Sequence, residues 1–516
     1  MNLQKLLFKI PIALAPILVA GCFQESFIDR NQSFFNTSTH SEVAPPPTLS
    51  SSEELLFIGL KPYLGKGTTF DTSSEYLNLI SQGHSLFLRD SAGRTYTSPE
   101  IKISWGRVLL NEPYEIARKV LGPFSSFESA EKVSLELSNL GIQSKIAHPF
   151  HWEVWVSEET QLPKQFLFSL FRAEITSIIK PILVLPKGDS TFLEGPIEIN
   201  APNGLLLDGG IYQGPFRIQK DAYGTWTLIE VVPLEKYLHG VVPHEIGHKA
   251  PPAALGAQAV LARTWAVANS HRYRIDGYHL CSNTQCQVYK DPSQISLEIL
   301  SAIEVTEGKF LSWKGEPIHA VYHASNGGIT ASIAEAWFVD ALPYFNSKLD
   351  GSLEWVNSFV LPFTDDEELE IFLDSEEGAY GTSHRLFRWK RRFTAEELQK
   401  ALKTYEVFDS DLKEIKVSER GLSGRVIWLE MIGEDKTSKV DLRLDEIRRV
   451  LRNLPSTLFL VKEIEEGVWE FTGAGFGHGV GLSQAGAIDL ALNGWTTDEI
   501  LSHYYPETMY GPLQNF

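Results

Sequence analysis

The stretch Glu230–Ala268 constrains the fold most, because three kinds of local structure follow one another within it. A β-branched run that ends at Pro233 predicts a strand, and a short helical segment follows. A loop then carries Glu245, and Pro251 and Pro252 precede a long alanine-rich helix. This order predicts an α+β protein built from antiparallel sheets and short helices, with a lone carboxylate displayed beside a helix.

The segment His244–His248 satisfies the pattern H-E-x-x-H of zinc metalloproteases. That pattern needs a helix, because only a helix places both histidines on one face. Pro243 precedes the segment and Gly247 lies inside it. Glycine costs about 1 kcal/mol and proline about 3 kcal/mol in a helix interior. We therefore expect a loop here, and a metalloprotease is the least favoured functional alternative.

Four motifs follow one another in chain order. The first covers Glu230–Val242 and continues through Glu245, Gln258 and Arg263. The other three read C-Q-V-Y, H-A-S-N-G-G and G-F-G-H-G-V-G-L-S-Q-A-G-A, and they occupy Cys286–Tyr289, His323–Gly328 and Gly475–Ala487. Together they closely resemble the stage II sporulation protein D / amidase-enhancer (SpoIID/LytB) family over about residues 200–510. One departure is Glu245-Ile246-Gly247, where the family usually has Glu-Met-Pro.

The resemblance implies a peptidoglycan lytic transglycosylase, which cleaves glycan strands after N-acetylmuramic acid and leaves 1,6-anhydro ends. One carboxyl group serves as acid and then as base in such a reaction, and Glu245 is the residue that fits. Its apolar neighbours Val241, Val242 and Ile246 are expected to raise its pKa. The plain alternative for Glu245 is a cap on the next helix. Arg263 is expected either to contact sugar or Glu245, or to form a structural ion pair.

The same resemblance implies a glycan-binding groove between the sheets and helices. The polar and glycine residues of the motifs are expected to line it: Gln258, Gln287, Tyr289, His323, Ser325, Gly327, Gly328, His478, Ser483, Gln484 and Tyr504. The expected partners are peptide-free glycan strands of the cell wall and a wall amidase. A protein that only binds glycan and enhances that amidase, without cutting, is the alternative function.

Three residues in one short segment suggest either a metal site or a disulfide. Cys281 and Cys286 would form a disulfide in an oxidising compartment. Some members of the family hold zinc at this place, and His279 would then be a third ligand. Zinc takes four ligands, so His323 or His478 would complete the site. The sequence leaves both alternatives open.

Residues 1–22 resemble a bacterial lipoprotein signal. Lys5 and Lys9 precede a short apolar stretch, and small residues lead to Cys22, the expected site of lipid attachment. The alternative is an ordinary secretory signal. Residues 23–54 are rich in Ser, Thr and Pro and predict a disordered tether. We expect an exported lipoprotein of the cell envelope, on the periplasmic side of a membrane and anchored without crossing it. The aspartate associated with retention in the inner membrane is missing, because Phe23 follows the cysteine. The outer membrane is therefore a candidate location.

The remaining chain divides into an N-terminal β portion of the main domain at 55–107, an αβ module at 108–160 and a catalytic domain at 180–516. The module begins with Gly122-Pro123-Phe124-Ser125-Ser126 and continues with an amphipathic pattern over Glu128–Leu140. It resembles a sporulation-related (SPOR) repeat, which binds peptide-free glycan. A structural insertion of the same αβ type is the alternative.

Charge excludes one class of partner. The chain has 46 basic and 65 acidic residues and a formal net charge of −19, so we expect no nucleic-acid binding. The opposed charge runs Asp365–Glu368 and Lys390–Arg392 are predicted to be solvated faces without chemistry.

Overall fold

The computed structural model describes residues 43–49, 55–70, 76–185, 189–403, 408, 410–435, 438–451 and 454–513. Residues 41–516 form one compact unit. The predicted signal, Cys22 and the tether, apart from residues 43–49, lie outside the described residues. Within the described ranges, no helix is long and apolar enough to span a membrane. The domain boundaries expected from the sequence remain predictions.

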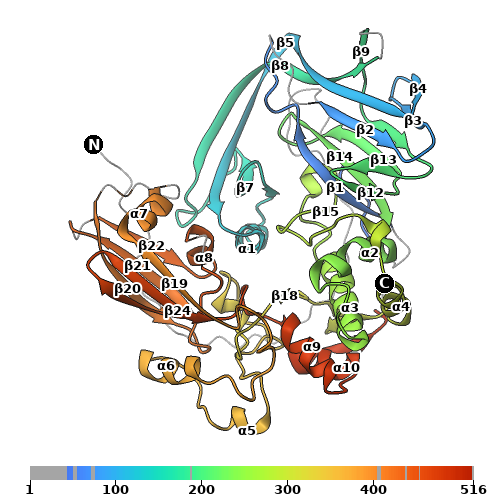
Figure 1. The fold of residues 1–516 in the computed structure, drawn as a ribbon. Helices are drawn as coiled ribbons and strands as arrows, with labels where there is room; N and C mark the ends of the chain where they lie inside the picture. Colours follow the sequence, from blue (N-terminus) through green and yellow to red (C-terminus); the bar gives the residue numbers. More distant parts are fainter. Residues whose placement is uncertain are drawn as a thin grey trace. The chain divides into compact units, whose positions relative to one another are not determined.

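A seven-stranded sheet carries the first predicted strands of the chain (Figure 1). Leu86 and Leu88 are buried and alternate with exposed neighbours, as expected for a strand with one face on the core. All neighbours pair antiparallel except β15, which runs parallel to β1. In spatial order the strands are β15 (Leu280–Cys281), β1 (Leu55–Leu64), β14 (Trp226–Pro233), β13 (Phe216–Lys220), β10 (Ile197–Asn200), β3 (Leu86–Arg89) and β4 (Thr95–Ser98).

A second, eight-stranded sheet is organised around one very long strand, β5 (Glu100–Phe124). This strand pairs with β2 at its start, with β8 along most of its length and with β7 at its end. The strands are β12 (Gly210–Tyr212), β11 (Leu205–Leu207), β2 (Leu77–Ser81), β5, β7 (Trp152–Ser157) and β6 (Lys145–Ala147), with β8 (Ser169–Val184) and β9 (Ser190–Phe192) on the other side of β5. The antiparallel sheets expected from the sequence are present.

Helix α1 (Phe127–Asn139) and strands β6 and β7 form the expected αβ arrangement. Ser126 caps the helix, because its hydroxyl accepts a hydrogen bond from the Ser129 amide at 3.3 Å. Buried Phe127 and Leu137 pack with Trp152 in a separate apolar cluster. The helix and strands predicted between 128 and 156 are therefore confirmed, whereas the likeness to a SPOR repeat stays a prediction.

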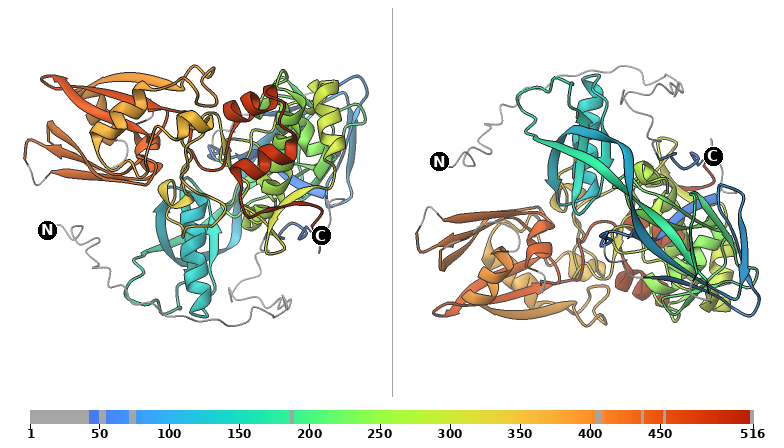
Figure 2. Two further views of the ribbon diagram at one scale, coloured as in Figure 1. Left: turned by 90° about the horizontal axis from the view of Figure 1, so that it is seen from below. Right: turned by 90° about the horizontal axis from the view of Figure 1, so that it is seen from above.

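Four helices of the described chain pack around α3, whose residues from Ala254 to Ala266 are all buried (Figure 2). Small side chains permit this close packing, and a Cβ added at Gly256 would lie 2.6 Å from the Thr497 hydroxyl. Thr496 and Glu499 form the predicted capping box. The helices are α2 (Leu234–Glu245), α3 (Pro252–Ala268), α4 (Leu297–Val305), α9 (Gln484–Leu492) and α10 (Thr497–Tyr504).

Short elements connect these helices to the rest of the unit. The strands are β16 (Phe310–Trp313), β17 (Glu316–Pro317), β18 (Tyr322–His323), β25 (Leu482–Ser483) and β26 (Met509–Gly511). The 3₁₀ helices are η1 (Arg274–Asp276), η2 (Pro292–Gln294) and η3 (Ile333–Glu335).

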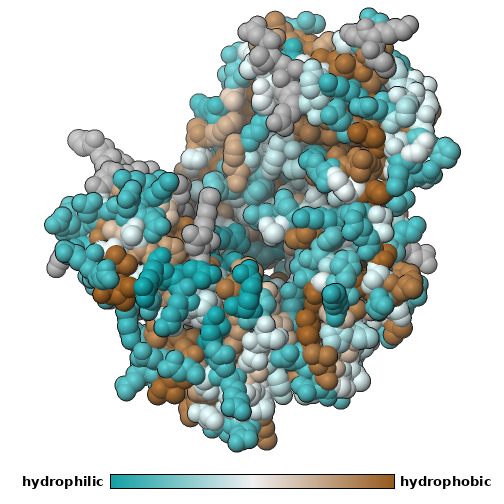
Figure 3. All heavy atoms as spheres, in the orientation of Figure 1, coloured by the Kyte–Doolittle hydropathy of each residue, from teal (hydrophilic) through white to brown (hydrophobic). Residues whose placement is uncertain are grey.

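Two further three-stranded sheets share an apolar cluster in the C-terminal part. Their strand orders are β19-β24-β23 and β20-β21-β22. Their outer surface is predominantly hydrophilic in Figure 3. The elements are α5 (Leu353–Val356), α6 (Asp366–Asp374), β19 (Arg388–Thr394), α7 (Ala395–Lys403), β20 (Leu412–Arg420), β21 (Val426–Gly433), β22 (Lys439–Arg443), α8 (Glu446–Val450), β23 (Phe459–Glu465) and β24 (Val468–Ala474).

One local prediction was wrong. The expected loop at 243–248 begins only after Glu245, because α2 continues through Pro243. The packing of buried Leu238 and Val241 outweighs the missing amide, which proline removes only in the last turn.

Candidate functional site

Glu245 is the last residue of α2 and is half-buried. The Val288 amide donates a hydrogen bond to its Oε1 at 2.8 Å. The Tyr322 hydroxyl is the second polar group that interacts with the carboxyl. Glu245 is therefore held at the end of a helix by two groups that come from two other motifs.

The surroundings of Glu245 raise the pKa of its carboxyl. Burial is the largest cause, and the hydrogen bonds from Val288 and Tyr322 oppose it only in part. No neighbouring carboxylate contributes to the shift among the residues that the structure describes. A carboxyl with a raised pKa retains its proton at higher pH than an ordinary glutamate and can act as a general acid.

Tyr322 joins the four motifs. Its hydroxyl has one proton and two acceptors, the Glu245 carboxyl and Oε1 of Gln287 at 2.9 Å, which therefore share it. Gln287 donates in turn to the carbonyl of Ala262 on α3 at 3.2 Å. The Tyr322 carbonyl accepts a hydrogen bond from Nε2 of His478 at 2.9 Å. Residues that are far apart in sequence thus meet around Glu245.

The H-A-S-N-G-G and glycine-rich motifs lie directly against each other. Ser325 and Phe476 form an isolated antiparallel bridge. Gly327 has φ +72°, and a Cβ there would lie 2.7 Å from the Gly475 amide nitrogen. Gly328 is equally constrained, because a Cβ would lie 2.9 Å from the Trp355 ring. Both glycines are buried and permit contact within the protein, whereas they were expected to line a glycan-binding groove.

His323 and His478 are neighbouring histidines with ring centroids 5.2 Å apart. Nδ1 of His323 donates to the Val480 carbonyl at 3.1 Å, and its Nε2 is buried without a partner among the described residues. Burial lowers the pKa of His478 to about 4 and that of His323 well below its usual range. Both rings are therefore neutral at neutral pH.

Several predicted substrate-binding residues lie in buried hydrogen-bond pairs. Gln484 donates to Gln258 at 3.1 Å, Tyr289 donates to Glu230 at 2.8 Å, and Tyr504 donates to Asp350 at 2.9 Å. Ser483 caps α9 by accepting from the Gly486 amide at 3.2 Å, and Ser325 accepts from the Gly327 amide at 3.4 Å. The structure thus gives these side chains a framework role and exposes none of them.

Arg263 does not contact Glu245. It is fully buried and its guanidinium donates to both carboxylate oxygens of Glu235 at 2.7 Å, with a further hydrogen bond to the Lys309 carbonyl at 3.1 Å. This corrects the expectation that Arg263 would orient the acid, and it bears out the ion-pair alternative. The physical reason is that a buried guanidinium needs a paired carboxylate, and Glu235 is the one within reach.

The sulfur atoms of Cys281 and Cys286 lie at disulfide distance, and the Cα atoms of the two residues are 5.7 Å apart. Both ring nitrogens of His279 are occupied by backbone groups. Nδ1 accepts from the Phe57 amide at 2.9 Å, and Nε2 donates to the Pro47 carbonyl at 2.7 Å. This arrangement favours the disulfide of the two alternatives, and the described residues contain no cluster of His, Cys, Asp or Glu suited to a metal.

The H-E-x-x-H segment does not form a metalloprotease helix. The helix ends at Glu245, and Gly247 has φ +86°, so His248 lies outside it. The rings of His244 and His248 are nearly perpendicular, with centroids 6.5 Å apart. The two histidines therefore do not form the one-face pair that the motif requires.

Two functional groups were missed by sequence reasoning. The Val288 amide is a backbone donor at the variable position of C-Q-x-Y, and its side chain gives no signal. Tyr322 directly precedes the motif that starts at His323, and its position there was the only available signal.

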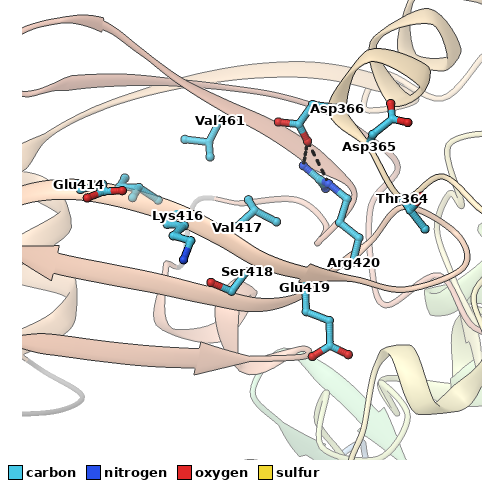
Figure 4. Close-up of a pocket in the computed structure, with 11 residues that line it drawn as sticks. Thr364, Asp365, Asp366, Glu414, Lys416, Val417, Ser418, Glu419, Arg420 and Val461 are labelled. Carbon is cyan, nitrogen blue, oxygen red and sulfur yellow. Dashed lines mark hydrogen bonds and ion pairs between the residues drawn. The ribbon is translucent and has the colours of Figure 1, made fainter.

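Two cavities open in the C-terminal part of the described chain. The first, of about 440 Å³, lies along β20 and the start of α6 (Figure 4). Its cations are paired, because Arg420 bonds Asp366 at 2.7 Å and Lys416 lies 3.2 Å from Glu430. The second, of about 450 Å³, lies beside Phe476 of the glycine-rich motif. Arg391 and Arg392 of the basic run contribute to its lining, and the side chains of Lys390 and Arg392 are 68% exposed, as expected for a solvated face.

Known proteins are similar to much of this chain. A family described as "Stage II sporulation protein" matches residues 222–313, and a domain of unknown function (DUF8618) matches residues 331–481. An uncharacterized protein of Brachyspira hyodysenteriae is 27% identical over 347 residues, which are 66% of this chain and 83% of that protein. The stage II sporulation protein D of Bacillus amyloliquefaciens is 29% identical over 54% of this chain and 74% of its own length. The amidase enhancer of Bacillus subtilis is 27% identical over 52% of this chain, but only 40% of that protein is covered.

Proposed function

Because this chain belongs to the stage II sporulation protein D / amidase-enhancer family, we propose that it is a peptidoglycan lytic transglycosylase with Glu245 as its single acid and base. Its role lies in the cell wall. We further propose that the glycan strands it cuts are peptide-free and occupy a groove beside Glu245.

One observation supports this proposal most. Burial, rather than a neighbouring carboxylate among the described residues, raises the pKa of Glu245, and the Val288 amide and the Tyr322 hydroxyl hold its carboxyl. A hydrolase of the common type would need a second carboxylate as nucleophile or base. A transglycosylase needs only one, because the substrate supplies its own nucleophile.

The reaction balances with this one residue. Protonated Glu245 gives its proton to the glycosidic oxygen as the bond between that oxygen and C1 of N-acetylmuramic acid breaks. The 6-hydroxyl of the same sugar attacks C1 and closes the 1,6-anhydro ring. Its proton passes to the Glu245 carboxylate, which restores the acid for the next cycle. No water is consumed.

Mass spectrometry of glycan fragments tests the proposal. The chain from residue 23 is incubated with purified peptide-free strands, beside Glu245→Gln. We expect anhydro-terminated fragments from the wild type and a rate about 10²–10⁴-fold lower for the variant, the range that general acid–base catalysis contributes. Fragments that carry one added water would instead identify a hydrolase.

The amidase enhancer is the second candidate, and the similarity to an amidase enhancer favours it. An enhancer would bind strands and raise the rate of a wall amidase without releasing any fragment itself. Strands that stay bound but uncut, by wild type and Glu245→Gln alike, would replace the first proposal by this one.

Two accompanying proposals concern the chain's chemistry and place. We propose that Cys281 and Cys286 form a disulfide rather than a zinc site, which thiol titration and metal analysis of the purified chain distinguish. We also propose that the protein is exported and held in the envelope by a lipid on Cys22.

A further inference from the structure

The cavity beside Phe476 lies outside the Glu245 site and within the segment matched by the domain of unknown function. It has a volume of about 450 Å³. It is lined by residues before and along β19, from α7, from the segment between α8 and β23 and from the glycine-rich motif, among them Arg385, Arg391, Arg392, Glu397 and Phe476.

The cavity has an excess of unpaired positive charge. Arg392 is paired with Glu470 at 2.8 Å, and Glu397 accepts from the Thr394 amide at 2.9 Å. Arg385 and Arg391 have no carboxylate within ion-pair distance in the part of the chain that the structure describes. This contrasts with the cavity of Figure 4, where the cations are neutralised, and with a chain whose net charge is −19. Within the described chain, Arg391 donates only to the Lys390 carbonyl, at 2.9 Å. Two guanidinium groups without a carboxylate partner among the described residues favour an anionic ligand in such an acidic protein.

An aromatic surface lies next to these arginines. Phe476 is 40% exposed, and its ring stacks on His384 with centroids 6.2 Å apart and an interplanar angle of 20°. Burial lowers the pKa of His384, so this ring is neutral at neutral pH. An exposed, flat aromatic face is suited to pack against the apolar face of a sugar ring.

Backbone hydrogen bonds connect Phe476 to the motif that begins beside Tyr322 of the Glu245 site. Its amide donates to the Ser325 carbonyl at 2.7 Å, and its carbonyl accepts from the Ser325 amide at 3.1 Å. Ser325 follows Tyr322 and His323 in the same motif, and His478 bonds the Tyr322 carbonyl. The cavity beside Phe476 and the surroundings of Glu245 are therefore built in part on the same two motifs.

We propose that this cavity is a second glycan-binding site that takes a carboxylate-bearing sugar of the cell wall. Phe476 packs against the sugar ring, and Arg385 and Arg391 pair with the carboxylate. This inference rests on the proposed cell-wall function. The carboxylate has two possible sources with the same chemistry, the lactyl group of a peptide-free muramic acid or the stem peptide of an intact strand.

Binding measurements in the Glu245→Gln background test the site, because strands then stay uncut. The probes are peptide-free strands, strands with stem peptides, and chitin oligosaccharides, which carry no carboxylate. We expect Arg385→Gln/Arg391→Gln to weaken binding of one acidic probe at least tenfold and to leave the weak binding of chitin oligosaccharides unchanged. Phe476→Ala should weaken binding of all three probes.

Matched controls come from the same chain. Lys416→Gln removes a paired cation from the other cavity, and Phe338→Ala removes a ring that is 59% exposed elsewhere. Both should bind like the parent, and melting temperatures verify that every variant is folded. Loss with peptide-free strands identifies the lactyl carboxylate, and loss with intact strands identifies the stem peptide.

The result that overturns the proposal is distinct from failure of the proposed function. If Arg385→Gln/Arg391→Gln and Phe476→Ala bind every probe like the parent while the wild type still releases anhydro fragments, the second site is wrong and the transglycosylase stands. If the wild type releases no fragment but these variants lose binding, the binding site stands and the catalytic proposal fails.

Discussion

At the scale of single residues, the environment of Glu245 decides what the carboxyl can do. Burial raises its pKa, and the hydrogen bonds from Val288 and Tyr322 lower it by a smaller amount. Arg263, which the sequence offered as a partner, is instead occupied by Glu235. The groups that lower the pKa of Glu245 are therefore a backbone amide and a phenol, and not a cation.

The effect of Tyr322 on Glu245 gives a pH prediction. The protonated acid is the active form, so the cleavage rate falls as pH rises through the raised pKa of Glu245. Tyr322→Phe removes a hydrogen bond that stabilises the ionised form, which raises the pKa further. The alkaline limb of the pH–rate profile should therefore move to higher pH, while Tyr96→Phe leaves it in place. A shift to lower pH would contradict this assignment.

The buried ion pair gives a stability prediction. Arg263→Ala leaves Glu235 without its partner and should lower the free energy of unfolding by about 3–5 kcal/mol, as measured by chemical denaturation. Glu235→Ala should cost a similar amount, because it leaves a fully buried guanidinium unpaired. The double variant should lose less than the sum of both. If Arg263→Ala has normal stability but no activity, Arg263 acts in catalysis and the structural assignment is wrong.

At the scale of elements, the site depends on two loops that contact each other through glycines. Gly327→Ala places a Cβ at φ +72° against the Gly475 backbone, which cannot move aside easily. We expect a loss of about 2–4 kcal/mol in unfolding free energy from strain and clash together. Gly494→Ala is the control, because Gly494 has φ +86° but no atom within 4 Å of the added Cβ, and should cost about 1 kcal/mol. Equal losses would show that contact between the loops is unimportant.

Some helices could be predicted from the local sequence pattern alone. Helices α1 and α10 have amphipathic spacing and side-chain caps, so their existence and ends could be predicted. The C-terminal end of helix α2 could not be predicted. The sequence shows the cost of Pro243 to the helix, but it does not show the packing of Val241 against the rest of the protein, which keeps the helix formed.

At the scale of the whole molecule, the proposed lipid anchor on Cys22 gives the last prediction. Cys22 lies outside the described residues, and its role rests on the sequence around it. Cys22→Ser should release the protein from the membrane fraction into the soluble fraction of the envelope, because a single lipid-bearing residue is the expected anchor. Immunoblots of fractionated cells measure this. Unchanged membrane association would indicate an ordinary signal and another means of attachment.

The sequence by itself determined the α+β class, the order of the four motifs, and Glu245 as the residue to test. These follow from local periodicity, turn residues and motif spacing. Only the tertiary structure decided that Gln258, Tyr289 and Tyr504 are buried in the framework, that Arg263 pairs with Glu235, and that the Val288 amide and Tyr322 hold Glu245. The physical reason is that each of these partners is chosen by packing between segments 28 to 226 residues apart, for which spacing along the chain carries no signal.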